Sequence, residues 1–325
     1  MIFLFLLFML AHLIGDFITQ NDNIAKYKRD KYRKKLFNRA IILHAFHHAI
    51  ITILLLCIFK KITLDLVLAT LIICFIHYFI DLAKSYLSDR IINKYKRADS
   101  QLNLFESNLK FILDKKSFYF ITDQVFHIIT IYWIMRSYGV VYPPGLLVEK
   151  VQALMNHDLV LTLPTTFVSL LIIFILISWA SGYFVGIVID DLKQGETLDQ
   201  VAAIKEKDVF EKFYEDERKN MVIEKSWESE EKIGNKRSLK VQFHYFNEED
   251  NNSAGMFIGI LERILIALFV IINAYQGLIV IGALKTLARF KQFDAKSFAE
   301  YYLIGTLLSI ILGLVLGGIA KIIIN

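Results

Sequence analysis

Four apolar segments of the chain each carry a pair of residues drawn only from histidine and aspartate, and the members of a pair are four positions apart. On an α-helix this spacing places both side chains on one face, one turn apart, so that one helix can offer two ligands to a metal ion. A single pair would carry little weight, but four consecutive segments repeat the spacing. The pairs are His12 and Asp16, His44 and His48, His77 and Asp81, and Asp123 and His127.

These eight side chains need a common explanation, because ionisable groups at membrane depth cost about 2.5–3.5 kcal/mol each on insertion scales. Polar packing, in which such groups hydrogen-bond across helices, would account for one or two pairs. It does not account for the same spacing on four helices, and a proton or ion path is a third interpretation. We therefore treat all eight as candidate metal ligands. His47 lies about 100° from the face of His44 and His48, so we expect it to face lipid or to support a ligand.

The elements that position these residues must be membrane helices. With 55% hydrophobic residues and a mean hydropathy of +0.47 over 325 residues, the chain is too apolar for a soluble domain. We predict an all-α, polytopic transmembrane helical bundle of about seven spanning helices plus a re-entrant or short helix at Gln276–Phe290. The first apolar run has no basic n-region and no small-x-small cleavage site, so we expect it to be retained. The expected spans are residues 2–19, 40–59, 64–87, 118–137, 165–189, 255–275 and 299–321.

The distribution of basic residues predicts the orientation of these spans. Lysine and arginine number 8 in Asn21–Ala40, 7 in Ser88–Ser117 and 11 in Asp190–Ser253. The alternate loops, Lys60–Asp65 and Arg136–Pro164, hold 2 each. By the positive-inside rule we expect the three basic loops to be cytoplasmic and the N-terminus to lie outside, in a cytoplasmic (inner) membrane.

Three regions follow from this pattern. We expect residues 1–138 to form a four-helix membrane bundle with the His/Asp cluster, and residues 139–164 to form an extracytoplasmic loop. Residues 165–325 would form a C-terminal membrane bundle, interrupted by a mixed cytoplasmic loop domain at 190–253.

The cytoplasmic segment 190–253 carries mixed charge. Thr197 and Gln200 have capping-box spacing and predict a helix start there, and alternation over Leu239–Tyr245 predicts a short strand. The segment is interpreted either as a solvated cap or as a binding site for a cytoplasmic protein partner. The net charge of +5 is modest and no nucleic-acid module is visible, so membrane lipids are the other expected partner.

Small residues mark the last helices. A GxxxG occurs in both Ser181–Ile187 and Ala254–Ile260, and the final span carries Gly305, Ser309, Gly313 and Gly317. Such residues let helix backbones approach closely in lipid, so we predict a tightly packed scaffold and allow an oligomer through the same helices. A duplicated transport unit with broken helices is the rival interpretation.

Two adjacent charges lie inside the sixth apolar run. Glu262 and Arg263 point about 100° apart on a helix, so each needs its own partner on a neighbouring helix. We predict that Glu262 pairs with Lys285 or Arg289 on the short segment that follows. Snorkelling of both charges to the interface is the alternative.

Four segments resemble, in this order, the bacterial multi-pass family described as domain of unknown function 3307: HLIGDFITQ, LHAFHHA, IHYFIDLAK and TDQVFH. This resemblance covers about residues 1–138, and GMFIGILER, LARF and AEYYLIGTLLS are similar to the C-terminal half often joined to it. The family supplies no reaction. The residues that match its polar pattern are His12, Asp16, Gln20, His44, His48, His77, Asp81, Lys84, Asp123, Gln124 and His127.

Chain direction sorts the eight candidate ligands into two layers. Because consecutive helices alternate up and down, the order of each pair in depth reverses from one helix to the next. At a rise of about 1.5 Å per residue the layers are about 6 Å apart. We expect the deep layer to bind a transition metal and the three aspartates to bind a second ion or to act as the catalytic base. The deep layer is His12, His48, His77 and His127, and the shallow layer is Asp16, His44, Asp81 and Asp123.

This chemistry favours a metal-dependent integral-membrane hydrolase that acts on a lipid-like or amphiphilic substrate through a metal-bound water. Zinc suits nitrogen and oxygen ligands best, with iron or manganese next, as one or two ions. Cys57 and Cys74 form no metal motif, and we expect no serine or cysteine on the cluster's face. The alternatives are a metal-ion or proton transporter, and a non-catalytic membrane interaction protein with a structural metal site.

Overall fold

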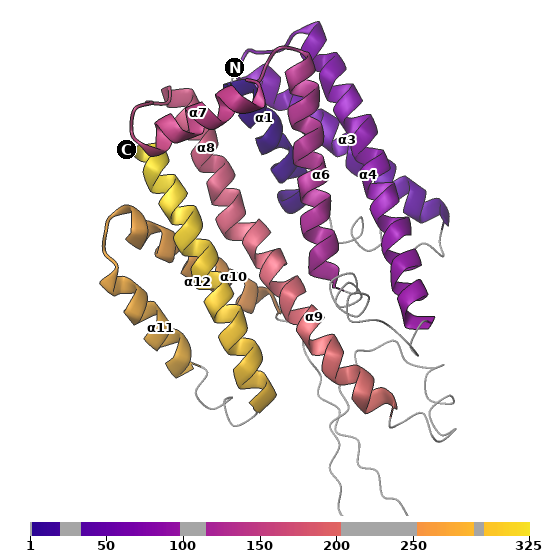
Figure 1. The fold of residues 1–325 in the computed structure, drawn as a ribbon, viewed down its shortest axis with the longest axis vertical. Coiled ribbons are helices and arrows are strands. Elements are labelled where there is room, and N and C mark those ends of the chain that lie inside the picture. Colours follow the sequence, from indigo (N-terminus) through magenta and orange to yellow (C-terminus); the bar gives the residue numbers. More distant parts are fainter. Residues whose placement is uncertain (1, 20–33, 98–114, 203–251, 289–295) are drawn as a thin grey trace, which may run out of the picture. The chain divides into compact units, whose positions relative to one another are not determined.

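The structure is a computed structural model that describes residues 2–19, 34–97, 115–202, 252–288 and 296–325 (Figure 1). Every regular element in these ranges is a helix, as the sequence predicts. The chain divides into two compact units, and all the packing described below lies within the first, Met1–Gln194 with Gly259–Asn325. The helices are α1 (Ile2–Leu13), α3 (Lys34–Ile58), α4 (Leu64–Arg97), α6 (Lys116–Ser137), α7 (Pro144–Met155), α8 (Leu163–Ile175), α9 (Ser181–Ala202), α10 (Asn252–Ile271), α11 (Gln276–Ala288) and α12 (Lys296–Ile324), with π-helical turns η1 (Ile14–Ile18) and η2 (Leu176–Ala180).

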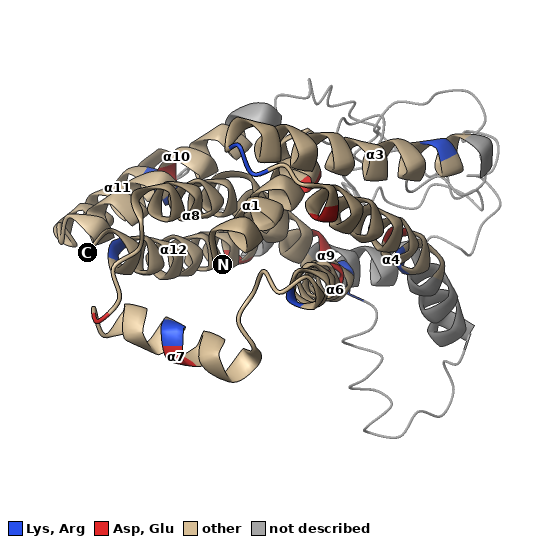
Figure 2. Ribbon diagram, turned by 90° about the horizontal axis from the view of Figure 1, so that it is seen from above, with Lys and Arg blue, Asp and Glu red and all other residues tan. Residues whose placement is uncertain are grey.

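Five stretches of helix in the described residues are long and apolar enough to cross a membrane. Two further apolar helices, Ile2–Ile18 and Gln276–Ala288, are shorter. Charged residues are sparse along the described helices, as Figure 2 shows. A membrane protein accounts for both observations. The five spans are Leu36–Ile58, Leu64–Tyr86, Lys116–Ser137, Leu163–Leu192 and Ala299–Ile324.

Two local predictions concern the segment 190–253. Thr197 and Gln200 lie inside α9, which continues from η2 to Ala202, so the predicted helix start at this capping box is wrong. An N-cap residue must leave the helical conformation, and here the preceding residues are already helical. The strand predicted at Leu239–Tyr245 lies outside the described residues.

The predicted loop at 139–164 contains a helix, α7, that the sequence pattern did not predict. Helix α7 begins with a proline in its first turn, where the missing N–H costs nothing. Val148, Val151 and Met155 are exposed on it at spacings of three and four residues. This helix runs across the direction of α8 rather than along it (Figure 1).

Helix α1 is the centre of the packing. It is buried over Leu7, Phe8 and the residues from Leu10 to Leu13. One side joins a cluster with α8, in which Leu10 and Val168 are buried. The other joins a cluster with α3, α4 and α6. Figure 1 shows α1 between α8 and the group formed by α3, α4 and α6, so its polar residues are held from both sides.

The C-terminal helices pair their charges as the sequence predicts. Lys285 Nζ on α11 donates to Glu262 Oε2 at 2.6 Å. Arg263 is 3% exposed, so the snorkelling alternative is wrong for this residue. Its Nε and one Nη donate to the carbonyl oxygens of Ile177 and Ser178 at 2.7 and 2.8 Å. These carbonyls belong to η2, where a π turn interrupts the ordinary α-helical bonding.

Candidate functional site

The eight predicted residues come together where α1, η1, α3, α4 and α6 meet. Seven of them are buried, and the Asp16 side chain is only 11% exposed. The rings of His77 and His127 are stacked with centroids 4.1 Å apart, and those of His48 and His77 are 4.2 Å apart. The spacing of four residues therefore did identify one face on each of four helices that turn toward a common point.

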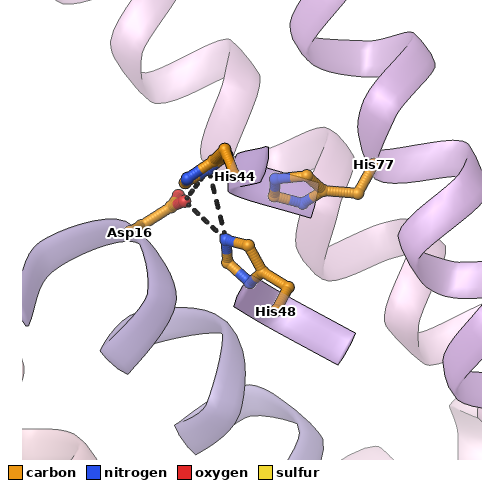
Figure 3. Close-up of side chains that lie close together, drawn as sticks. All are labelled: Asp16, His44, His48 and His77. Atoms are coloured by element: carbon orange, nitrogen blue, oxygen red, sulfur yellow. Dashed lines mark hydrogen bonds and ion pairs between the residues drawn. The ribbon is translucent and has the colours of Figure 1, made fainter. Parts of the chain in front are cut away.

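Asp16 joins two of these helices through its carboxylate. Its Oδ1 lies 3.1 Å from Nε2 of His44 and 3.2 Å from Nε2 of His48 (Figure 3). Its Oδ2 accepts a hydrogen bond from Nε2 of Gln124 at 2.8 Å. A Cβ on Gly15 would lie 2.3 Å from the His48 ring, so only glycine lets that ring approach η1 so closely.

The π turn η1 is what carries Asp16 to this point. A π turn adds one residue to a helical turn and is often found at functional sites. Because η1 follows α1 directly, it turns the carboxylate toward α3 while α1 still presents His12 to the cluster.

Two further carboxylates approach the histidines from α4 and α6. Asp123 Oδ1 is 3.5 Å from His127 Nε2, and Asp81 Oδ1 is 3.8 Å from the same nitrogen. Asp123 Oδ2 accepts a hydrogen bond from Lys84 Nζ at 2.6 Å, and the Lys84 side chain is 38% exposed. The ammonium fixes one oxygen of Asp123 and leaves the other directed at the histidines.

Several polar atoms of the cluster are buried without a hydrogen-bond partner in the described structure. They include Nε2 of His12, His77 and His127, and Oδ1 of Asp123. Leaving such a group unpaired costs about 1–3 kcal/mol by mutational measurements. A cation bound among them would satisfy the nitrogens and the carboxylate oxygen at once.

The described residues form three groups in which one ligand atom from each member lies within 4.8 Å of the others. Zinc–nitrogen bonds of about 2.0–2.1 Å need ligand atoms roughly 3.3 Å apart, so small side-chain rotations would suffice. His77 and His127 each occur in two groups. The groups are Asp16, His44, His48 and His77; His12, His77 and His127; and Asp81, Asp123 and His127.

A small cavity separates four of the eight residues from the other four. All four histidines of the predicted deep layer line it, and its lining includes none of the four shallow residues. The groups of potential ligands do not follow these layers, however, because Asp16 and His44 join His48 and His77. Rotation about the side-chain bonds reaches across one helical turn, so a single ion need not be bound by one layer.

The cavity also corrects a prediction about cysteine. Cys74, one turn before His77 on α4, lines it beside the histidines. We expected no cysteine on this face. Cys74 and His77 are three residues apart, however, and this spacing places two side chains on one helical face as well as a spacing of four does. Cys74 is in none of the potential ligand groups.

Other residues of the polar pattern have different roles. His47 is half-buried and is in none of the groups. Lys84 and Gln124, which hold Asp123 and Asp16, were not predicted as site residues. Both match the polar pattern of the family resemblance, which is the signal that could have found them, and Lys84 also lies three residues after Asp81 on the same helical face. Gln20 lies outside the described residues.

One family model matches the chain, over residues 4–153, and its description is "Protein of unknown function (DUF3307)". The resemblance predicted from the polar motifs is therefore shown, and it extends past residue 138 into α7. All eight residues of the cluster lie within the match. No curated protein and no solved structure matches the chain significantly.

Proposed function

We propose that this protein is a metal-dependent integral-membrane hydrolase that acts on a lipid-like or amphiphilic substrate. The observation that carries this proposal is that the Nε2 atoms of His12, His77 and His127 and the Asp123 Oδ1 atom are buried without a hydrogen-bond partner in the described structure. The carboxylate oxygens beside the three nitrogens lie 3.5–3.7 Å away, beyond good hydrogen-bond distance. Polar packing alone would favour paired groups, because each unpaired one destabilises the bundle.

The donor atoms suffice for two ions. A first ion would be bound by His12, His77 and His127, three nitrogen ligands that leave a fourth position open, as in catalytic zinc sites. Asp16, His44 and His48 would bind a second. Nitrogen and oxygen donors favour zinc, with iron or manganese as alternatives.

The protein's own groups supply proton transfer. The bound ion would activate a water molecule as the nucleophile. Asp123 Oδ1, with Oδ2 fixed by Lys84, is placed to accept the proton that this water loses. The water oxygen would then bond to the carbonyl carbon or phosphorus of the substrate, the ester bond would break, and the departing alkoxide would take the proton from Asp123. Asp16 and Asp81 would bind ions or share this role as base.

The membrane setting completes the proposal. We assign about seven spanning helices in a cytoplasmic membrane, with the N-terminus outside and the basic loops cytoplasmic. Helix α11 would be re-entrant, supported by the Lys285–Glu262 pair that ties it back to α10. The cluster then lies in the cytoplasmic half of the bilayer, where an amphiphile can enter sideways.

Metal analysis of the purified protein tests the centre. We expect one or two equivalents of transition metal in the wild type. His77→Ala and His127→Ala should lose the most, because these two histidines each belong to two ligand groups. His47→Ala is the matched control, since it removes an imidazole from α3 outside the groups and should retain the metal. Full metal retention in a His77→Ala/His127→Ala double variant would overturn the proposal and leave polar packing as the explanation.

Hydrolysis is tested separately with Asp123→Asn. This variant keeps the shape of the side chain but cannot accept the proton, so turnover of ester lipids in vesicles should fall by about 10²–10⁴-fold while bound metal changes little. A metal-loaded wild type that releases neither fatty acid nor headgroup would contradict the hydrolase and favour a structural metal site.

A further inference from the structure

We infer that the cavity beyond the four histidines is the chamber for the small reactant of this centre, water, and that the amphiphile reaches the centre from the opposite, carboxylate side. This inference rests on the proposed function and adds which face of the cluster each reactant uses.

The position of the cavity is the first argument. On each helix the cavity is lined by one histidine of the pair and by residues about one turn beyond it, on the side away from the other member of the pair. Phe8 on α1 and Thr52 on α3 are examples. Cys74 on α4 and Thr130 on α6 complete the pattern. The same displacement on four helices places the space at one end of the cluster.

Size is the second argument. The cavity has a volume of about 20 Å³, whereas a single water molecule needs roughly 10–15 Å³ measured in the same way. One water molecule therefore fits, and a lipid headgroup does not. The wall is completed by Ile73 and Ile131, which leave no room for a larger polar group.

The polar groups of the lining are the third argument, because a buried water molecule needs two to four partners. His12, His77 and His127 line the cavity and have buried Nε2 atoms without hydrogen-bond partners. Thr52 donates its hydroxyl proton to the His48 carbonyl oxygen at 2.8 Å, so its oxygen can still accept a hydrogen bond. Water held in this space would pass onto an ion bound to the three nitrogens, of which that of His127 lies 3.5 Å from Asp123 Oδ1, the proposed base.

The opposite side of the cluster is more accessible. Lys84 is 38% exposed and contacts Asp123, and Asp16 is 11% exposed, whereas the imidazole of His127 is 2% exposed. A bulky substrate can approach past Lys84, whose ammonium suits an anionic headgroup. Access from two sides lets water occupy the ion before the substrate covers the centre.

Cobalt substitution tests which side carries the open position. The visible spectrum of bound Co²⁺ reports whether an added anion enters its coordination sphere. Cyanide and azide serve as probes, because they have two and three heavy atoms. Cys74→Leu fills the cavity wall, Cys74→Ala enlarges it, and Cys57→Leu is the matched control, because Cys57 is exposed on α3 and does not line the cavity.

We expect Cys74→Leu to weaken cyanide binding by about tenfold, as inserted methylenes crowd a packed wall. Cys74→Ala should strengthen azide binding by a similar factor, and this result is decisive even if Cys74→Leu does not fold. Cys57→Leu should leave both affinities unchanged. If cobalt binds but neither Cys74 variant changes its affinity for cyanide or azide, the water chamber is wrong and the proposal of a metal centre is unaffected. A wild type that binds no cobalt would overturn both.

Discussion

The N-terminal helices that form the cluster and the C-terminal helices both bury ionisable groups, but they satisfy them differently. Around Arg263 each charge has a defined protein partner: two carbonyl oxygens of η2 accept from the guanidinium, and Lys285 pairs with Glu262. In the cluster, the Nε2 atoms of His12 and His77 are buried without hydrogen-bond partners in the described structure.

This difference separates a structural role from a ligand-binding one. A polar group whose partners lie in the protein gains nothing from an ion and stabilises the packing of helices. A converging set of donors without partners destabilises the folded chain until something binds. The comparison predicts that substitutions near Arg263 change stability alone, whereas substitutions in the cluster change metal binding first.

The largest effect is expected for Arg263→Met. It removes the guanidinium donors to the Ile177 and Ser178 carbonyl groups, and each buried hydrogen bond lost costs about 1–3 kcal/mol. Thermal unfolding in detergent should therefore shift strongly downward, while metal bound per folded molecule stays at the wild-type level. Arg263→Lys should recover part of the loss, because an ammonium can donate to one of the carbonyls. Unchanged unfolding in Arg263→Met would show that η2 does not depend on this side chain.

A matched pair of glycine substitutions sharpens the comparison. In Gly317→Ala the new Cβ would lie 2.7 Å from the Ala267 Cα atom, so α10 and α12 must separate. In Gly15→Ala it would lie 2.3 Å from Cε1 of the His48 ring, which can swing away. We expect Gly317→Ala to destabilise folding by about 1–3 kcal/mol with metal retained. Gly15→Ala should lower metal affinity by about tenfold with little change in unfolding.

Metal titration and thermal unfolding of the same preparations measure both quantities. The comparison fails if Gly15→Ala destabilises the protein as much as Gly317→Ala does, because the His48 ring would then be part of the rigid packing. It also fails if Gly317→Ala releases the metal from folded protein.

The sequence was sufficient to predict an all-helical membrane protein and the four helix faces that meet, although it did not predict α7. The His/Asp pairs are governed by helical periodicity and by the cost of burying charge, and both are local properties of the chain. The Glu262–Lys285 pair could be predicted for the same reason, since the two residues lie on consecutive apolar segments joined by a short turn.

Features that depend on packing between distant helices could not be predicted. No local pattern marks Ile14–Ile18 or Leu176–Ala180 as π turns, because the inserted residue is accommodated by neighbouring helices. The partners of Arg263 are main-chain oxygens, which have no sequence signature. The grouping of Asp16 with His48 across the two layers depends on η1 and on the space beside Gly15.

The smallest effect is expected where charges are paired outside the cluster and near the surface. The Lys285 and Glu262 side chains are 20% and 13% exposed, so the protein encloses this pair less completely than Arg263, which is 3% exposed. We expect Glu262→Gln to lower stability by about 1 kcal/mol, with metal content unchanged. The double variant with Lys285→Met should cost no more than the two single changes together, and the difference measures the coupling between the side chains. Strictly additive losses in thermal unfolding would mean that the contact contributes nothing, and the C-terminal helices would then depend on Arg263 and the small residues of α12 alone.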